Sequence, residues 1–120
     1  MPHLTIDYSS HLAGSFDPAA LVKELHPLVA EESGTTGVCK TLLRPVVTFV
    51  GDRPSEETVF VHVEVGLMPG RPETQRTRLS EAVLALLGKH LRVEGVPPEA
   101  VLSVEVRDLA ASYRLSPSAR

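Results

Sequence analysis

The clearest strand pattern in the chain lies in the segment Thr58-Val59-Phe60-Val61-His62-Val63-Glu64-Val65-Gly66. Valine occupies every second position, and phenylalanine, histidine and glutamate alternate with it. Because successive side chains of a strand point to opposite faces, this alternation predicts a strand with one apolar face and one mixed face. Both faces need a cover. We expect helices on one side, and a second copy of the chain on the other, since the chain is small.

Segments on both sides of this strand repeat one order of elements. A short alternating strand over Leu4–Tyr8 precedes a helix over Asp17–Glu32, in which Asp17 is a good N-cap and Pro18 suits the first turn. A strand region follows over residues 37–50. Downstream of residues 58–66, the spacing of apolar residues predicts a helix over Pro72–Leu91 and a last strand over Val101–Val106.

This order, strand–helix–strand twice, predicts an α+β fold built from two βαβ units. Each unit should have parallel strands and a right-handed crossover, so that two units form a four-stranded mixed sheet with both helices on one face. Two prolines interrupt the pattern. We expect Pro27 to kink the first helix or end its regular part, and Pro45 to interrupt a long irregular strand at a sheet edge.

Length and composition restrict the possible classes of protein. The 120 residues fit one domain, which we place at residues 1–112, with a loose or partner-dependent tail at 113–120. The net charge is −3 without a basic run, which argues against nucleic acid, and no apolar stretch is long enough to cross a membrane. The N-terminus lacks the features of a signal peptide, so we expect a cytoplasmic protein. The single cysteine, Cys39, excludes an internal disulfide and a cysteine-rich zinc site.

Pro2 is the first candidate catalytic residue. A small residue after Met1 is the usual context for removal of the initiator methionine, which would leave Pro2 with a free secondary amine. Burial and nearby cations both lower the pKa of an amine, because both disfavour the ammonium form. Such an amine would act as a general base near neutral pH and move a proton between two positions of one substrate. While Met1 is present, the proline nitrogen is an amide and has no such role.

Three cationic residues are candidates for binding a substrate carboxylate. Arg71 follows Gly70 at the entrance of the second helix, where a guanidinium can bind a carboxylate through two hydrogen bonds. Lys40 and Arg44 lie four residues apart and share one face of a strand. The alternative for all three is a solvated surface cation. Histidine and glutamate side chains can bind metal ions, but no ligand spacing motif joins His3, His62 and Glu64. We therefore expect that the histidines belong to the core or to an interface, and that the chain binds no metal.

The chain resembles the 5-carboxymethyl-2-hydroxymuconate isomerases of the tautomerase superfamily. The resemblance is carried by Met1-Pro2-His3-Leu4, by Val59-Phe60-Val61-His62-Val63, and by Gly70-Arg71 before a helix with Gln75-Arg76; it runs from Pro2 to about Leu109. It implies a homotrimer with inward-facing sheets, an amino-terminal proline as base, no cofactor, and a small anionic dienol as substrate. The implied reaction moves a proton from an enol oxygen to a distant carbon, in homoprotocatechuate catabolism.

Residue by residue, the resemblance matches Pro2 to the catalytic proline and Arg71 to a substrate-binding arginine. A second family arginine aligns with Lys40, which does not offer a planar fork, and Arg44, four residues on, is the alternative match. Two alternatives to this isomerase therefore stay open. One is a related tautomerase that acts on a smaller 2-hydroxydienoate, and the other is a non-catalytic ligand-binding or assembly module, because fold alone does not establish activity.

Overall fold

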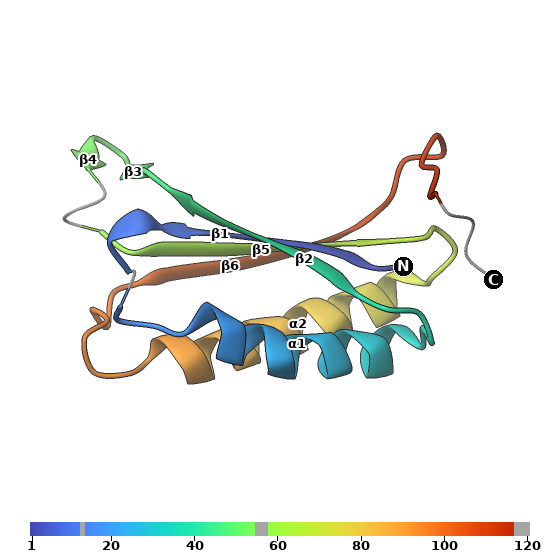
Figure 1. Cartoon of the computed structure of the whole chain (residues 1–120), viewed down its shortest axis with the longest axis horizontal. Helices are drawn as coiled ribbons and strands as arrows, with labels where there is room; N and C mark the ends of the chain where they lie inside the picture. Colours follow the sequence, from blue (N-terminus) through green and yellow to red (C-terminus); the bar gives the residue numbers. More distant parts are fainter. Residues whose placement is uncertain (13, 55–57, 117–120) are drawn as a thin grey trace.

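The structure is a computed structural model that describes residues 1–12, 14–54 and 58–116. It has two layers, a sheet and a pair of helices that cover one of its faces (Figure 1). In chain order the elements are β1 (His3–Ser9), η1 (Ser10–Leu12), α1 (Pro18–Ser33), β2 (Lys40–Val46), β3 (Phe49–Val50), β4 (Arg53–Pro54), β5 (Phe60–Leu67), α2 (Glu73–Leu91) and β6 (Val101–Asp108).

The main sheet has four strands in the order β2-β1-β5-β6. Strands β1 and β2 are parallel, as are β5 and β6, whereas the two central strands β1 and β5 are antiparallel. This confirms the predicted α+β architecture of two βαβ units in one mixed sheet. A separate two-stranded ribbon, β3–β4, was not predicted and extends from the end of β2.

Helix α1 begins as the sequence predicts. The carboxylate of Asp17 accepts a hydrogen bond from the Ala20 amide at 3.1 Å, and Gly34 ends the helix in the left-handed region at a φ of 74°. The expectation that Pro27 ends the regular part of the helix is wrong, because α1 continues to Ser33. The buried stripe of Leu21, Leu25 and Val29 continues past the proline, and its packing offsets one lost backbone hydrogen bond.

The expectation of a long strand interrupted at Pro45 is also wrong. Strand β2 runs without a break from Lys40 to Val46, and Pro45 lies beside Tyr8 of β1. The edge position itself is confirmed, since β2 is an outer strand of the sheet. A proline is tolerated there because an edge strand has one side on which no ladder hydrogen bond is needed.

The core lies between the sheet and the helices. The valines of the alternating segment supply its centre, with Val61, Val63 and Val65 fully buried, and Leu4 and Ile6 of β1 join them. Helix α2 contributes Leu79, Val83, Leu87 and Leu91 at helical spacing. The opposite side of the sheet, which we call the open face, carries the alternate residues of each strand: His3, Thr5 and Asp7 on β1, Lys40, Leu42 and Arg44 on β2, Phe60, His62 and Glu64 on β5, and Ser103, Glu105 and Arg107 on β6.

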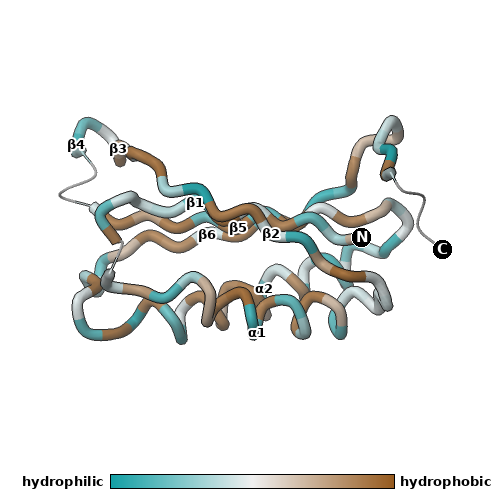
Figure 2. The backbone as a smooth tube through the Cα atoms, in the orientation of Figure 1, coloured by the Kyte–Doolittle hydropathy of each residue, from teal (hydrophilic) through white to brown (hydrophobic). Residues whose placement is uncertain are grey.

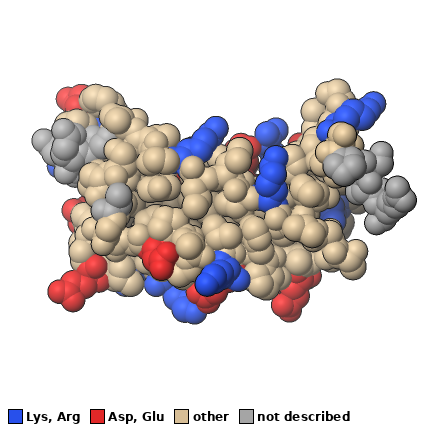
Figure 3. Space-filling view, in the orientation of Figure 1, with Lys and Arg blue, Asp and Glu red and all other residues tan. Residues whose placement is uncertain are grey.

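The open face is hollowed between two projections. The β3–β4 ribbon rises at one end, and the segment after β6 rises at the other, near the N-terminus (Figures 1 and 3). The tail is not wholly loose, because Tyr113 packs on His3 with ring centroids 5.0 Å apart and their side chains share a 2.8 Å hydrogen bond. Residues 117–120 of the predicted tail lie outside the described residues. Within the described chain, neither helix has the length and apolarity of a membrane span.

Candidate active site

Pro2 lies at the start of β1, at the end of the sheet where β2 begins and β5 ends. Its side chain is buried, and its carbonyl accepts a hydrogen bond from the Lys40 amide at 3.1 Å. Met1 is partly exposed beside the loop that joins α1 to β2, where a Cβ on Gly37 would come within 3.9 Å of the Met1 Cα. The structure therefore places the predicted base in an apolar position that a main-chain hydrogen bond holds in register with β2.

A lysine lies close to Pro2 in the sheet. Lys40 is the register partner of His3, the residue after Pro2. The pKa of His3 is lowered, first by burial and then by the charges of Lys40 and the N-terminal ammonium. Burial and the charge of Lys40 would act in the same way on an amine at Pro2, because each disfavours an added positive charge. Of the predicted site residues, Pro2 and Lys40 are thus brought together.

Arg71 connects the second helix to the first. Its Nε donates to the Ser33 carbonyl at 2.8 Å, and its Nη1 donates to the Met68 carbonyl at 3.0 Å. The neighbouring Gln75 donates from Nε2 to the Glu32 carbonyl at 3.0 Å, so both side chains serve the open C-terminal carbonyls of α1. The guanidinium has five N–H donors, and within the described residues its Nη2 group makes no hydrogen bond. Arg71 therefore has a structural role and retains donors for a ligand.

Arg44 does not join Pro2 within one chain. It shares the open face with Lys40 as predicted, but four residues of strand separate them by roughly 13 Å. Its guanidinium binds Asp7 of β1 through two hydrogen bonds, Nε to Oδ1 at 2.7 Å and Nη2 to Oδ2 at 3.0 Å. Asp7 raises the pKa of Arg44 and neutralises its charge locally.

Arg44 and Asp7 border a hollow of about 770 Å³ on the open face, whose lining includes Phe60, His62 and Ser103. Figure 3 shows this side of the molecule with Lys and Arg side chains along it. The sequence analysis did not predict this hollow. Its lining comes from four strands, and their relative register is fixed by packing on the other face of the sheet.

Two further residues near the predicted site were missed. Tyr113 contacts His3 and brings the segment after β6 to the Pro2 end of the sheet. Ser33 is buried in the last turn of α1, and its Oγ has no hydrogen-bond partner among the described residues, although its carbonyl accepts from Arg71. Neither role has a local sequence pattern, since both depend on contacts between segments far apart in the chain.

The family model described as 5-carboxymethyl-2-hydroxymuconate isomerase matches residues 2–118, nearly the whole chain. The chain belongs to the 5-carboxymethyl-2-hydroxymuconate isomerase family. It is therefore an isomerase of the tautomerase superfamily. Among curated proteins, none matches it by sequence.

Solved structures agree with this family in fold. A 5-carboxymethyl-2-hydroxymuconate isomerase from Deinococcus radiodurans R1 superposes with a TM-score of 0.80 at 20% identity, over 95% of this chain and 88% of that one. A 5-carboxymethyl-2-hydroxymuconate delta-isomerase gives 0.73 at 20% identity, over 96% and 87%. A fused 4-OT, described as a symmetric trimer, gives 0.67 at 12% identity, over 90% and 87%. The βαβ–βαβ fold of the isomerase family is thus reproduced by this chain.

Proposed function

We propose that this member of the family converts 5-carboxymethyl-2-hydroxymuconate to its unsaturated 2-oxo isomer, with Pro2 as the base after Met1 has been removed. The observation that carries the proposal is the position of Pro2, buried at the start of β1 and bonded to the first residue of β2, in a chain of this family. The homoprotocatechuate pathway comes with the family resemblance, and we keep a cytoplasmic location as a proposal of its own.

The reaction needs one base that works at two positions. The amine of Pro2 takes the proton of the enol hydroxyl, the electron pair moves along the conjugated diene, and the resulting ammonium returns the proton to a distant carbon. The C=O bond forms as the terminal C=C bond takes up the proton. Atoms and charge balance without a cofactor.

Cations at this site would bind the substrate and would also lower the pKa of the Pro2 amine. The substrate carries three carboxylates, and Lys40 and the unused donors of Arg71 would bind two of them at this end of the sheet, where Arg107 also lies, beside Gly66 in the ladder. Burial and the charge of Lys40, which lower the pKa of His3, would also keep the Pro2 amine unprotonated, and Lys40 would stabilise the developing dienolate. Arg44 takes part only if a neighbouring subunit brings it to another chain's Pro2, since within one chain it binds Asp7.

We also propose that the enzyme is a homotrimer whose sheets face inward. Apolar side chains are exposed from β2 to β3, where Val47 is 76% and Phe49 66% exposed, and Leu42 is half exposed on the open face. Figure 2 shows β3 in the colour of hydrophobic residues. Exposed apolar groups in such number favour an interface. A Phe49→Ser variant should shift the mass measured by light scattering from trimer toward monomer, and an unchanged trimer would remove Phe49 from the interface.

The activity test compares two forms of one chain. Protein without Met1 should consume the dienol in a spectrophotometric assay, and protein that retains Met1 should be slower by about 10²–10⁴-fold, the usual contribution of a general base. Circular dichroism of the two forms checks that the fold is the same. Equal rates would exclude Pro2 as the base. Retention of Met1 by protein from the native host would favour a non-catalytic binding module instead.

A smaller 2-hydroxydienoate is the second candidate substrate. It is favoured by Lys40, which presents a point charge where a bidentate arginine is expected. Turnover of a tricarboxylate and a dicarboxylate dienol by the same Met-free protein separates the candidates. A higher kcat/KM for the dicarboxylate would favour the smaller substrate and leave the role of Pro2 intact.

A further inference from the structure

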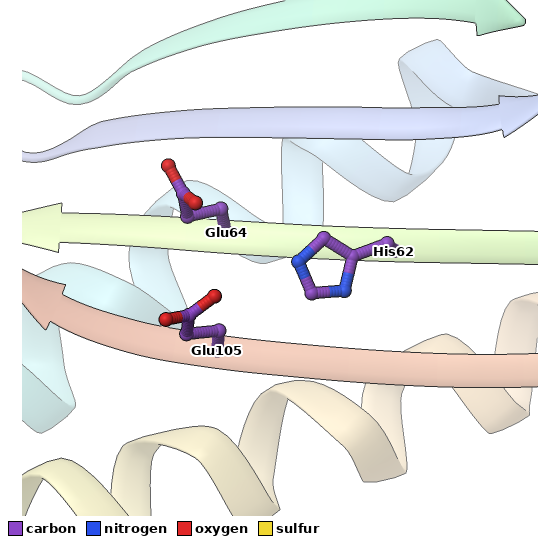
Figure 4. A group of neighbouring side chains, drawn as sticks. All are labelled: His62, Glu64 and Glu105. Carbon is purple, nitrogen blue, oxygen red and sulfur yellow. The ribbon is translucent and has the colours of Figure 1, made fainter.

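The parallel register of β5 and β6 brings together, on the open face, side chains that can bind a metal ion. Glu64 lies beside Glu105, and His62 lies beside Ser103, in adjacent pairs of the same ladder. Figure 4 shows the His62 ring pointing along the sheet toward the two carboxylates, with one nitrogen directed at them. One potential ligand atom from each of His62, Glu64 and Glu105 lies within 4.8 Å of the others.

The charges of this cluster are incompletely balanced. Two glutamates directly across a ladder repel each other, an arrangement that destabilises a sheet unless a cation compensates for it. Arg107 supplies part of the compensation, because its Nε lies 3.0 Å from Glu64 Oε1. Glu105 has no ion pair within the described part of the chain. The cluster therefore retains an excess negative charge, and Glu64 Oε2 and both oxygens of Glu105 are available to a further cation.

His62 is oriented to contribute a lone pair. Its Nδ1 lies 2.7 Å from Ser103 Oγ. When Nδ1 donates its proton to that hydroxyl, Nε2 carries the lone pair on the side of the glutamates. A hydrogen bond from the distal ring nitrogen to a fixed acceptor is the arrangement that orients histidine ligands in metal sites.

We propose that His62, Glu64 and Glu105 form a binding site for a divalent transition-metal ion, with Zn²⁺ as the expected occupant. One imidazole and two carboxylates suit a borderline ion better than a soft one, and Zn²⁺ accepts nitrogen and carboxylate oxygen ligands without a geometric preference of its own. Bonds of about 2.0–2.2 Å place ligand atoms about 3–4 Å apart, so small side-chain rotations close the site. Water would complete the coordination.

The bound ion would connect β5 to β6 on the face opposite the helices. It is separate from the proposed reaction, because none of its three ligands has a role in that reaction. The site therefore does not depend on the proposed function. The sequence pattern did not predict it, because Ser103 and Glu105 lie about forty residues after His62 and only the strand register joins them.

Calorimetric titration of ZnCl₂ into the EDTA-treated full chain tests the proposal. We expect one ion per chain, and at least about 10-fold weaker binding for Glu105→Gln. Glu105 is exposed within one chain, so the variant should fold and assemble, which its circular dichroism, its mass by light scattering and its Tm in EDTA will show. Ser103→Ala should weaken binding by about 10–100-fold through loss of the orienting hydrogen bond. Zn²⁺ should raise the Tm of the original chain and leave that of Glu105→Gln almost unchanged.

A matched control uses the other described contact between a glutamate and a histidine. Glu24 contacts His90 between the two helices and also bonds to Lys89 at 2.9 Å. Glu24→Gln should bind Zn²⁺ as the original chain does. No binding at millimolar Zn²⁺, unchanged binding by Glu105→Gln, or loss of binding only in Glu24→Gln would each overturn the proposed site.

Discussion

The two faces of the sheet differ in burial and in polarity, although neighbouring residues of the same strands form them. On the helix face, Ile6 of β1 lies beside Val63 of β5, and both are completely buried. One residue along, on the open face, Asp7 lies beside His62, and both are partly exposed. The apolar face fixes the register of the strands, because a slip by one residue would expose all its valines. The polar side chains of the open face are thereby positioned by contacts in which they take no part.

Substitutions on β1 should give the largest difference between the two faces in the free energy of unfolding. Ile6→Ala removes a fully buried side chain and should lower the free energy of unfolding by about 2–5 kcal/mol. Thr5→Ala, its neighbour on the open face, should change it by no more than about 0.5 kcal/mol. Urea unfolding of both variants measures this difference. Similar losses in the two would show that the open face contributes to stability as the core does.

The same contrast explains what the sequence could and could not predict. Period-two valines identified β5, and Asp17-Pro18 identified the start of α1, because burial and capping act through near neighbours in the sequence. The pairing of Glu64 with Glu105 was not predictable, since it needs the register between strands. The expectations that Pro27 ends the regular helix and that Pro45 interrupts its strand were wrong for a related reason. Packing of α1 on the core, and the edge position of β2, override local propensities.

The candidate site likewise has features that the sequence could predict and contacts that it could not. Met1-Pro2 and the cations Lys40 and Arg71 are visible in the sequence, and family resemblance gives them roles. The two hydrogen bonds from Arg71 to main-chain carbonyls are not visible there, because they join α1, the end of β5 and the start of α2. The contact of Tyr113 with His3 spans almost the whole chain. Such contacts follow from the completed fold and not from any local pattern.

A smaller effect should distinguish the structural and binding roles of Arg71. Lysine cannot reproduce two hydrogen bonds from a planar fork, so Arg71→Lys should lower the free energy of unfolding by about 1–2 kcal/mol. If Arg71 also binds substrate, KM for the dienol should rise. Arg78→Lys, an exposed position of α2, is the matched control and should leave both quantities unchanged. Unchanged stability in Arg71→Lys would contradict the structural role.

The smallest predicted effect concerns the pH dependence of the contact between His3 and Tyr113, where the tail meets the open face. Because the folded pKa of His3 is lowered, the unfolded chain binds this proton more readily. Stability from His3 is therefore present above about pH 6.5 and lost as the pH falls through the lower folded pKa. The urea midpoint of the original chain should fall from pH 7 to pH 5, and His3→Gln should lack part of that fall.

Glu24 provides the control, because its pKa is also lowered, by its hydrogen bonds to Lys89 and His90. The stability it contributes is lost only below its ordinary pKa of about 4.5, which is a separate window. Glu24→Gln should therefore keep the full slope between pH 7 and pH 5 and differ from the original chain only at lower pH. If His3→Gln instead kept that slope, burial of the imidazole beside Lys40 would have no energetic consequence. The effect that burial and Lys40 are proposed to have on the pKa of a Pro2 amine would then lose its support.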